Sequence, residues 1–204
     1  MFKKILLFLL GWMALGAAAQ PVLLVYGDSL SAGYGLPQGK GWVDLLADRL
    51  GAEKLDYRVV NASVSGETTL GGANRIDAVL TQHHPAIVVV ELGGNDGLRG
   101  LSLAATRQNL ERIVSAARGA GAKPLLIGMQ LPPNYGTAYT EKFQAVFEGV
   151  AREGRIPLVP FMLAGFGEKR EYFQADGIHP KVEAQPLILD NIWPVLRPML
   201  GKSR

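Results

Sequence analysis

Ser29, Asp176 and His179 are residues whose types and spacing in this 204-residue chain could perform nucleophilic catalysis. Ser29 comes directly after a short apolar run and lies in Gly-Asp-Ser, with glycines close behind. Asp176 precedes His179 by three residues, so one turn could bring its carboxylate to the histidine Nδ1. That bond would fix the imidazole tautomer and leave Nε2 facing the serine. We therefore expect a nucleophile, a general base and an orienting carboxylate.

Acyl transfer from a serine also needs hydrogen-bond donors for the oxyanion of the tetrahedral intermediate. Asn95 lies in the turn Leu-Gly-Gly-Asn-Asp-Gly and would supply a side-chain amide. Gly66 and Ser29 would supply backbone N–H groups, and the bare backbone of Gly66 could approach the reacting carbon. Singly these motifs are weak, because glycine and asparagine are ordinary turn residues and Ser29 could be a helix N-cap. Their combination is what predicts an oxyanion hole.

Other candidate residues have ordinary interpretations. His83 and His84 lie near the end of an expected helix, where they can interact with the helix dipole, and as neighbours they point in different directions. We therefore expect no metal site and no cofactor. Ser102 lies in Gly-Leu-Ser-Leu-Ala, which resembles the Gly-x-Ser-x-Gly nucleophile turn of other hydrolases but lacks its last glycine. It is predicted to cap a helix.

Apolar runs alternate along the chain with amphipathic stretches, which predicts right-handed βαβ crossovers. The expected strands are Val22–Tyr26, Arg58–Asn61, Ala86–Leu92, Pro124–Met129 and Pro157–Val159. The expected helices are Trp42–Leu50, Leu70–Gln82, Leu103–Arg118 and Thr140–Glu153, followed by a last helix from Val182 that Pro186, Pro194 and Pro198 should kink or break. This alternation predicts one three-layer α/β/α domain with a five-stranded parallel sheet. The carboxyl ends of its strands meet at one edge, where the polar turns would converge.

Two segments without regular pattern follow strands and are candidates for contact with substrate. The first follows the fourth expected strand, and the second is Phe161–Ala175. The residues expected to offer a mainly apolar substrate-binding surface in the first are Leu131, Pro132, Tyr135 and Tyr139.

Residues 1–19 are predicted to be a secretory signal, and 20–204 the mature domain. Lys3 and Lys4 precede the apolar run Ile5–Leu15 and a small-residue site ending at Ala19. The run is shorter than the roughly 20 residues of a membrane span, so a retained anchor is the less favoured alternative. Without the two lysines, 19 basic residues face 18 acidic ones, and no basic cluster suggests a nucleic-acid partner. We expect a periplasmic or secreted monomer that acts on a small molecule.

Four motifs, in this order, resemble those of the SGNH (GDSL-type) hydrolase family: Gly27–Gly35, Glu91–Gly100, Leu131–Gly136 and Asp176–Pro180. The similarity is to its periplasmic thioesterase, lysophospholipase and arylesterase branch, and it covers nearly the whole mature chain. It implies a flavodoxin-like sheet, Ser29, His179 and Asp176 as the catalytic set, and Ser29, Gly66 and Asn95 as the oxyanion hole. It also implies a mobile loop over 131–139 that contacts the acyl chain.

These observations together predict an exported serine hydrolase that cleaves carboxylic esters and thioesters through an acyl-enzyme on Ser29. The resemblance implies acyl-CoA-type thioesters, lysophospholipids and aryl esters as substrates. One alternative is a carbohydrate O-acetylesterase with the same catalytic residues, which the apolar 131–139 segment disfavours. The other is a non-catalytic periplasmic ligand-binding module, which should lack a member of the catalytic set.

Overall fold

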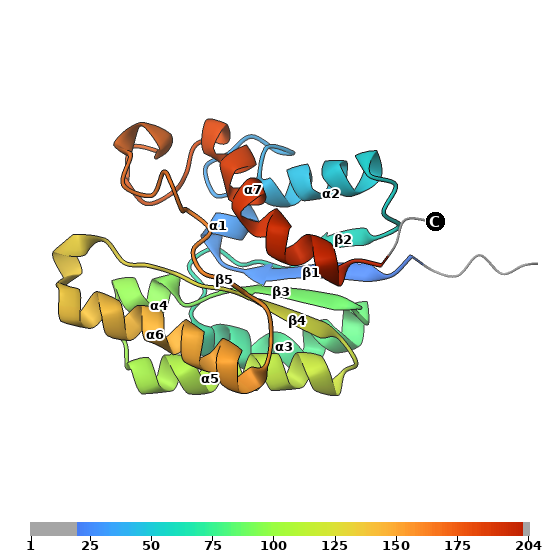
Figure 1. Cartoon of the computed structure of the whole chain (residues 1–204), viewed down its shortest axis with the longest axis horizontal. Coiled ribbons are helices and arrows are strands. Elements are labelled where there is room, and N and C mark those ends of the chain that lie inside the picture. Colours follow the sequence, from blue (N-terminus) through green and yellow to red (C-terminus); the bar gives the residue numbers. More distant parts are fainter. Residues whose placement is uncertain (1–19, 202–204) are drawn as a thin grey trace, which may run out of the picture.

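Five parallel strands form the sheet from which the polar turns project (Figure 1). A computed structural model describes residues 20–201, so the predicted signal at 1–19 lies outside the described residues. The strands are β1 (Val22–Gly27), β2 (Arg58–Asn61), β3 (Ile87–Glu91), β4 (Lys123–Ile127) and β5 (Leu158–Val159), in the spatial order β2-β1-β3-β4-β5. The predicted five-stranded parallel sheet is confirmed.

The two central strands β1 and β3 are apolar without alternation because both of their faces are covered by helices. Every residue of both strands is buried. The edge strand β2 is different, since Arg58 and Asn61 at its two ends are exposed.

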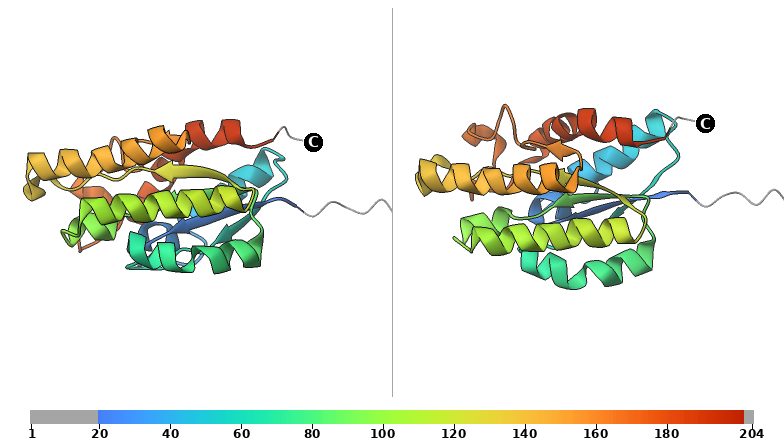
Figure 2. Two further views of the ribbon diagram at one scale, coloured as in Figure 1. Left: turned by 90° about the horizontal axis from the view of Figure 1, so that it is seen from below. Right: turned by 60° about the horizontal axis from the view of Figure 1, so that its bottom comes forward.

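Helices cover both faces of the sheet, which gives three layers (Figure 1). One face carries α2 (Trp42–Ala52) and α7 (Gln185–Leu196), which pack against each other. The other carries α3 (Thr69–His83), α5 (Leu103–Gly119) and α6 (Thr137–Gly154), which lie side by side (Figure 2). Two short helices, α1 (Ser29–Ala32) and α4 (Gly94–Leu98), follow β1 and β3. No helix within residues 20–201 is long and apolar enough to cross a bilayer.

The C-terminal segment forms one continuous helix with a 3-10 turn at each end. A 3-10 turn at Val182–Ala184 leads into α7, and another at Arg197–Met199 follows it. Pro186 lies in the first turn of α7, where its missing N–H costs no helical hydrogen bond. Pro194 lies inside α7, and the helix continues past it to Leu196. Of the two predicted outcomes, a kink or a break, the structure therefore excludes a break at Pro194.

The segment after β4 is more regular than its sequence suggests. A 3-10 turn covers Pro133–Tyr135, and α6 begins at Thr137, three residues before the predicted start. Gly136, with φ of 85°, provides the backbone bend, and its carbonyl accepts the N–H groups of Tyr139 and Thr140. Tyr139 therefore belongs to the first helical turn and not to an irregular loop.

Candidate active site

The turns that carry the predicted residues meet at the carboxyl edge of the sheet. The last residues of β1 and β3, Gly27 and Glu91, are paired, so the turns after these adjacent strands start side by side. A loop that follows the 3-10 turn Arg170–Tyr172 brings Asp176 and His179 to the same place. This is the edge at which ligands bind in open α/β sheets.

A continuous chain of hydrogen bonds links three of the predicted residues. His179 Nε2 lies 2.9 Å from Ser29 Oγ, and His179 Nδ1 lies 2.7 Å from Asp176 Oδ2. The other carboxylate oxygen of Asp176 accepts the N–H groups of Ile178, at 2.9 Å, and His179, at 3.0 Å. The three-residue spacing thus lets Asp176 close its own turn while it orients the imidazole.

The Asp176 carboxylate remains ionised over the whole physiological range. Burial by itself would raise its pKa, but the hydrogen bonds from the His179 ring and from the His179 and Ile178 N–H groups lower the pKa to about 2. The anion therefore faces the ring nitrogen that must keep its proton for Nε2 to accept one from the serine.

Tyr34 and Gln174 support the histidine, and the sequence analysis singled out neither. The Tyr34 and His179 ring centroids are 4.5 Å apart. Gln174 Nε2 donates to the Tyr34 carbonyl at 2.9 Å and to the Pro180 carbonyl at 3.3 Å, which ties the two loops together. Tyr34 lies within the glycine-rich motif after Ser29, and Gln174 lies within the irregular segment Phe161–Ala175, and these were the available signals.

Ser29 is the first residue of α1 and not its cap. The N-cap is Asp28, whose Oδ1 accepts the Leu30 N–H at 3.0 Å. The strand residue Gly27 leaves the space that this turn needs. A Cβ added at Gly27 would lie 2.5 Å from Glu91 Oε2 and 2.8 Å from Ser31 Oγ.

Gly66 is required for its backbone conformation. Its φ of 79° lies in the left-handed region, while a Cβ added there would meet nothing nearer than Arg99 Nη2 at 3.8 Å. The backbone conformation, and not crowding around the Cα, is therefore the reason for a glycine at this position.

Asn95, the second residue of α4, already has acceptors for its amide group. Its Nδ2 donates to Asp28 Oδ2 at 2.9 Å and to the Glu67 carbonyl at 3.0 Å. Donation to an oxyanion therefore requires one of these bonds to be shared or exchanged. The same amide joins the nucleophile turn to the segment that carries Gly66.

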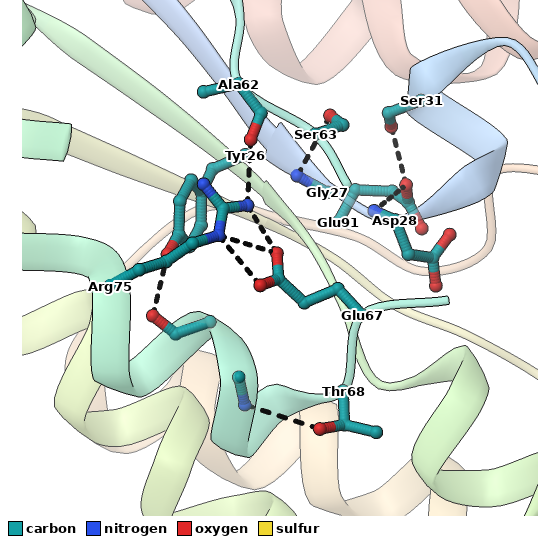
Figure 3. Close-up of polar contacts among 12 residues, drawn as sticks. Tyr26, Gly27, Asp28, Ser31, Ala62, Ser63, Glu67, Thr68, Arg75 and Glu91 are labelled. Atoms are coloured by element: carbon teal, nitrogen blue, oxygen red, sulfur yellow. Dashed lines mark hydrogen bonds and ion pairs between the residues drawn. The ribbon is translucent and has the colours of Figure 1, made fainter. Parts of the chain in front are cut away.

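The carboxyl groups of Asp28 and Glu91 are both buried at the nucleophile turn, and neither was predicted from the sequence (Figure 3). Glu91 Oε2 accepts the Ser31 hydroxyl at 2.5 Å and the Asp28 N–H at 3.3 Å, and Oε1 has no partner among residues 20–201. Burial raises the pKa of Glu91 well above its usual range and also raises that of Asp28. A single acidic residue ending the apolar strand Ile-Val-Val-Val-Glu was the signal for Glu91.

Three of the four residues predicted to bind substrate, Leu131, Tyr135 and Tyr139, contact α4. Leu131 is buried next to Gly97, where an added Cβ would lie 2.8 Å from Leu131 Cδ2. Pro132 is exposed. Tyr135 and Tyr139 are half-buried, and their hydroxyls donate to the carbonyls of Leu98 at 3.1 Å and Gly97 at 3.4 Å. The structure thus brings this surface beside the helix of Asn95.

A separate hollow of about 600 Å³ lies beside the segment that follows β5. Its lining includes Phe161, Leu163, Phe166, Lys169 and Asn191, and none of the predicted catalytic or oxyanion residues.

The remaining candidates have structural roles. His83 ends α3 and His84 is its C-cap, while Ser102 caps α5 by accepting the Ala105 N–H at 3.3 Å, as predicted. Within residues 20–201 no group of three or more His, Asp or Glu side chains is arranged to hold a metal ion.

Residues 25–185, which include the end of β1, strands β2 to β5 and the Ser29–His179–Asp176 chain, match the GDSL-like lipase/acylhydrolase family. The chain belongs to this family. It is accordingly a hydrolase with the SGNH fold.

Relatives of this family resemble the chain over most of its length. It is 54% identical over 183 residues to the esterase TesA of Pseudomonas aeruginosa, covering 90% of this chain and 91% of that protein. It is 44% identical over 185 residues to thioesterase 1/protease 1/lysophospholipase L1 of Escherichia coli K12, covering 91% and 88%. The crystal structure of TesA matches with a TM-score of 0.86 over 88% of this chain and 99% of that one.

Proposed function

We propose that this GDSL-family chain is an exported hydrolase of carboxylic esters and thioesters that forms an acyl-enzyme on Ser29. The observation that carries the proposal is the hydrogen-bonded chain from Asp176 through His179 to Ser29 at the carboxyl edge of the sheet. A non-catalytic binding module would have no need for this alignment of nucleophile, base and carboxylate.

The reaction begins when Ser29 Oγ attacks the substrate carbonyl carbon and His179 Nε2 takes the hydroxyl proton. The Asp176 carboxylate stabilises the resulting imidazolium. The tetrahedral oxyanion rests on the N–H groups of Ser29 and Gly66, and on an Asn95 amide hydrogen that turns from its present acceptor. The C–O or C–S bond then breaks as His179 protonates the leaving alcohol or thiol. Water repeats the sequence and releases the carboxylic acid.

The proposed substrates are acyl esters and thioesters whose acyl chain lies on the surface formed by Pro132, Tyr135 and Tyr139, with Leu131 buried next to Pro132. Names of relatives support this class, since one is an esterase and another a thioesterase and lysophospholipase. A carbohydrate O-acetylesterase would have no use for an apolar surface beside α4.

Export is proposed from the sequence of residues 1–19, which would leave 20–204 as the mature, monomeric domain. The position of β1 supports this boundary, because the first strand begins at Val22, just after the proposed cleavage site. Cell fractionation with N-terminal sequencing of the recovered protein tests it, and a retained N-terminus in the membrane fraction would contradict it.

The catalytic proposal is tested with p-nitrophenyl esters, an acyl-CoA and a lysophospholipid. Ser29→Ala should abolish hydrolysis of all three with the melting temperature nearly unchanged, and an organophosphate should label the wild-type serine. Ser102→Ala is the matched control. The Ser102 hydroxyl caps α5 by accepting the Ala105 N–H, and it has no histidine partner within residues 20–201. Loss of activity in Ser102→Ala, or retention in Ser29→Ala, would contradict the assignment.

A further inference from the structure

Arg75, on α3, binds both ends of the segment that contains Gly66 (Figure 3). Its Nε donates to the two carboxylate oxygens of Glu67, at 2.7 and 2.9 Å, and its Nη2 donates to Glu67 Oε2. The same Nη2 donates to the carbonyl of Ala62 at 2.8 Å. One guanidinium group therefore fixes the chain just before and just after the 63–66 turn.

The guanidinium itself is held in place by the core. It lies 4.1 Å from the ring centroid of Tyr26, a fully buried residue of β1 whose hydroxyl donates to the Gly72 carbonyl of α3 at 2.7 Å. The side chains of Arg75 and Glu67 are only 26% and 7% exposed. Burial acts to lower the pKa of Arg75, but the hydrogen bonds that Arg75 donates to Glu67 outweigh that effect and raise the pKa, so the group stays charged.

The segment held by Arg75 reaches two of the three proposed oxyanion donors. Gly66 lies within it, at a φ of 79° that few residues adopt. The backbone carbonyl of Glu67 accepts the Asn95 amide at 3.0 Å. The turn is also tied to the nucleophile strand, because the Gly27 N–H donates to Ser63 Oγ at 3.1 Å and the Val64 N–H to the Gly27 carbonyl at 3.0 Å.

From these contacts we propose that Arg75, acting through Glu67 and Ala62, is a positioning residue that fixes the oxyanion hole before substrate arrives. The inference rests on the proposed function and names a residue that does not touch substrate. Oxyanion donors help only when they already point to where the negative charge will develop. A turn without Arg75 would keep its bonds to Gly27 but lose its anchors at Ala62 and Glu67, so part of its order would have to be restored in the transition state.

A second arginine offers a matched control for the purely structural effect of losing such a pair. Arg49 of α2 pairs with Asp190 of α7 at 2.7 Å and lies 5.3 Å from the Trp193 ring centroid. Arg49 thus makes the same kinds of contact as Arg75, an ion pair and a cation–π contact between elements. It does not contact the Gly66 segment or the residues of the catalytic set.

The experiment compares kcat and KM of Arg75→Met, Arg75→Lys, Glu67→Gln and Arg49→Met on p-nitrophenyl esters, with urea unfolding of each. Arg75→Met should lower kcat about 10- to 100-fold with KM changed less than about threefold, because the loss belongs to the transition state. The kcat of Arg75→Lys should lie between those of the wild type and Arg75→Met, because an ammonium group keeps the charge but cannot make the forked contact. Arg49→Met should keep kcat within about twofold even if it unfolds at lower urea.

A second readout is the affinity for a trifluoromethyl ketone, which forms a tetrahedral oxyanion adduct with the serine. If Arg75 positions the oxyanion donors, this affinity should fall across the variants in proportion to kcat/KM, while the affinity for the product carboxylate stays within about twofold. A folded Arg75→Met with the kcat and ketone affinity of Arg49→Met would overturn the inference. If Arg75→Met does not fold, Glu67→Gln and Arg75→Lys decide in the same way.

The two proposals fail separately. An inactive wild type, or an active Ser29→Ala, would overturn the proposed hydrolase site. An active wild type with unaffected Arg75 variants would overturn only the positioning role.

Discussion

Asn95 directs its side-chain amide at Asp28, with Nδ2 2.9 Å from Oδ2 of the residue that precedes the proposed nucleophile. The second amide hydrogen goes to the Glu67 carbonyl, next to Gly66. The side-chain amide of Asn95, a proposed oxyanion donor, therefore also joins the turn after β1 to the turn after β2. Its arrangement couples the position of the nucleophile to the position of the backbone donor.

Asn95→Ala should lower kcat by about 10²–10³, the usual loss for one oxyanion donor. It should also lower the urea midpoint, because the Asp28 carboxylate is left buried with one fewer donor. Asn191→Ala is the control, since that amide likewise bridges two carbonyls, those of Met162 and Ala164, outside the proposed site. Equal kcat values for the two variants would exclude Asn95 from the oxyanion hole.

Asp176→Asn should lower kcat by about 10³–10⁴ with a small change in KM. The asparagine can still accept the Ile178 and His179 N–H groups, but its amide would favour the wrong imidazole tautomer. Because the pKa of Asp176 is lowered to about 2, wild-type Asp176 keeps its charge as the pH falls to well below 4. Steady-state kinetics of both proteins check this, and a variant whose loss lies mainly in KM would contradict an orienting role.

Glu91→Gln should make stability less dependent on pH. Burial raises the pKa of Glu91 above its unfolded value, so the folded chain retains a proton that the unfolded chain releases. Stability of the wild type must then fall as the pH rises above the ordinary carboxyl range, near 4.3 for glutamate, toward the raised folded pKa. A neutral carboxamide removes that contribution, so the difference in unfolding free energy should shift in favour of the variant as pH rises.

Urea unfolding at pH 5, 6.5 and 8 measures this difference, with Glu148→Gln on the exposed face of α6 as the control. Parallel pH curves for Glu91→Gln and the wild type would show that Glu91 is ionised in the folded chain. We also expect kcat of Glu91→Gln at pH 7 to stay within about threefold, because the carboxamide can still accept from Ser31 and the Asp28 N–H.

Lengthening the acyl chain from acetyl to hexanoyl should raise kcat/KM several-fold or more, since each methylene buried contributes up to about 0.8 kcal/mol. Tyr139→Ser should flatten this dependence and Tyr139→Phe should not, because the phenyl ring retains the apolar surface. Phe161→Ser tests the separate 600 Å³ hollow and should leave the chain-length profile unchanged. If acetyl esters are the best substrates and longer esters are rejected, the carbohydrate acetylesterase becomes the preferred function.

The sequence by itself determined the architecture and the local half of the proposed site. Apolar runs such as Ile87–Val90 predict strands with two covered faces, and alternation with helices leaves a parallel sheet as the outcome. Asp176 and His179 could be paired because three residues separate them and one turn decides their contact. The proximity of Ser29 to His179 was predicted from the rule that the carboxyl ends of parallel strands lie at one edge of the sheet.

Tertiary structure alone decided which polar groups share hydrogen bonds across that edge. Glu91 meets Ser31 and Asn95 meets Asp28 over separations of 60 and 67 residues, and such contacts depend on strand register and on the direction of each side chain. Arg75 reaches Glu67 and the Ala62 carbonyl because α3 packs so that the guanidinium lies over the Tyr26 ring. Sequence periodicity indicates which side of a helix or strand is apolar. Whether a hydrogen bond forms depends on differences of a few tenths of an ångström in the donor–acceptor distance. That precision exists only once the elements are packed together.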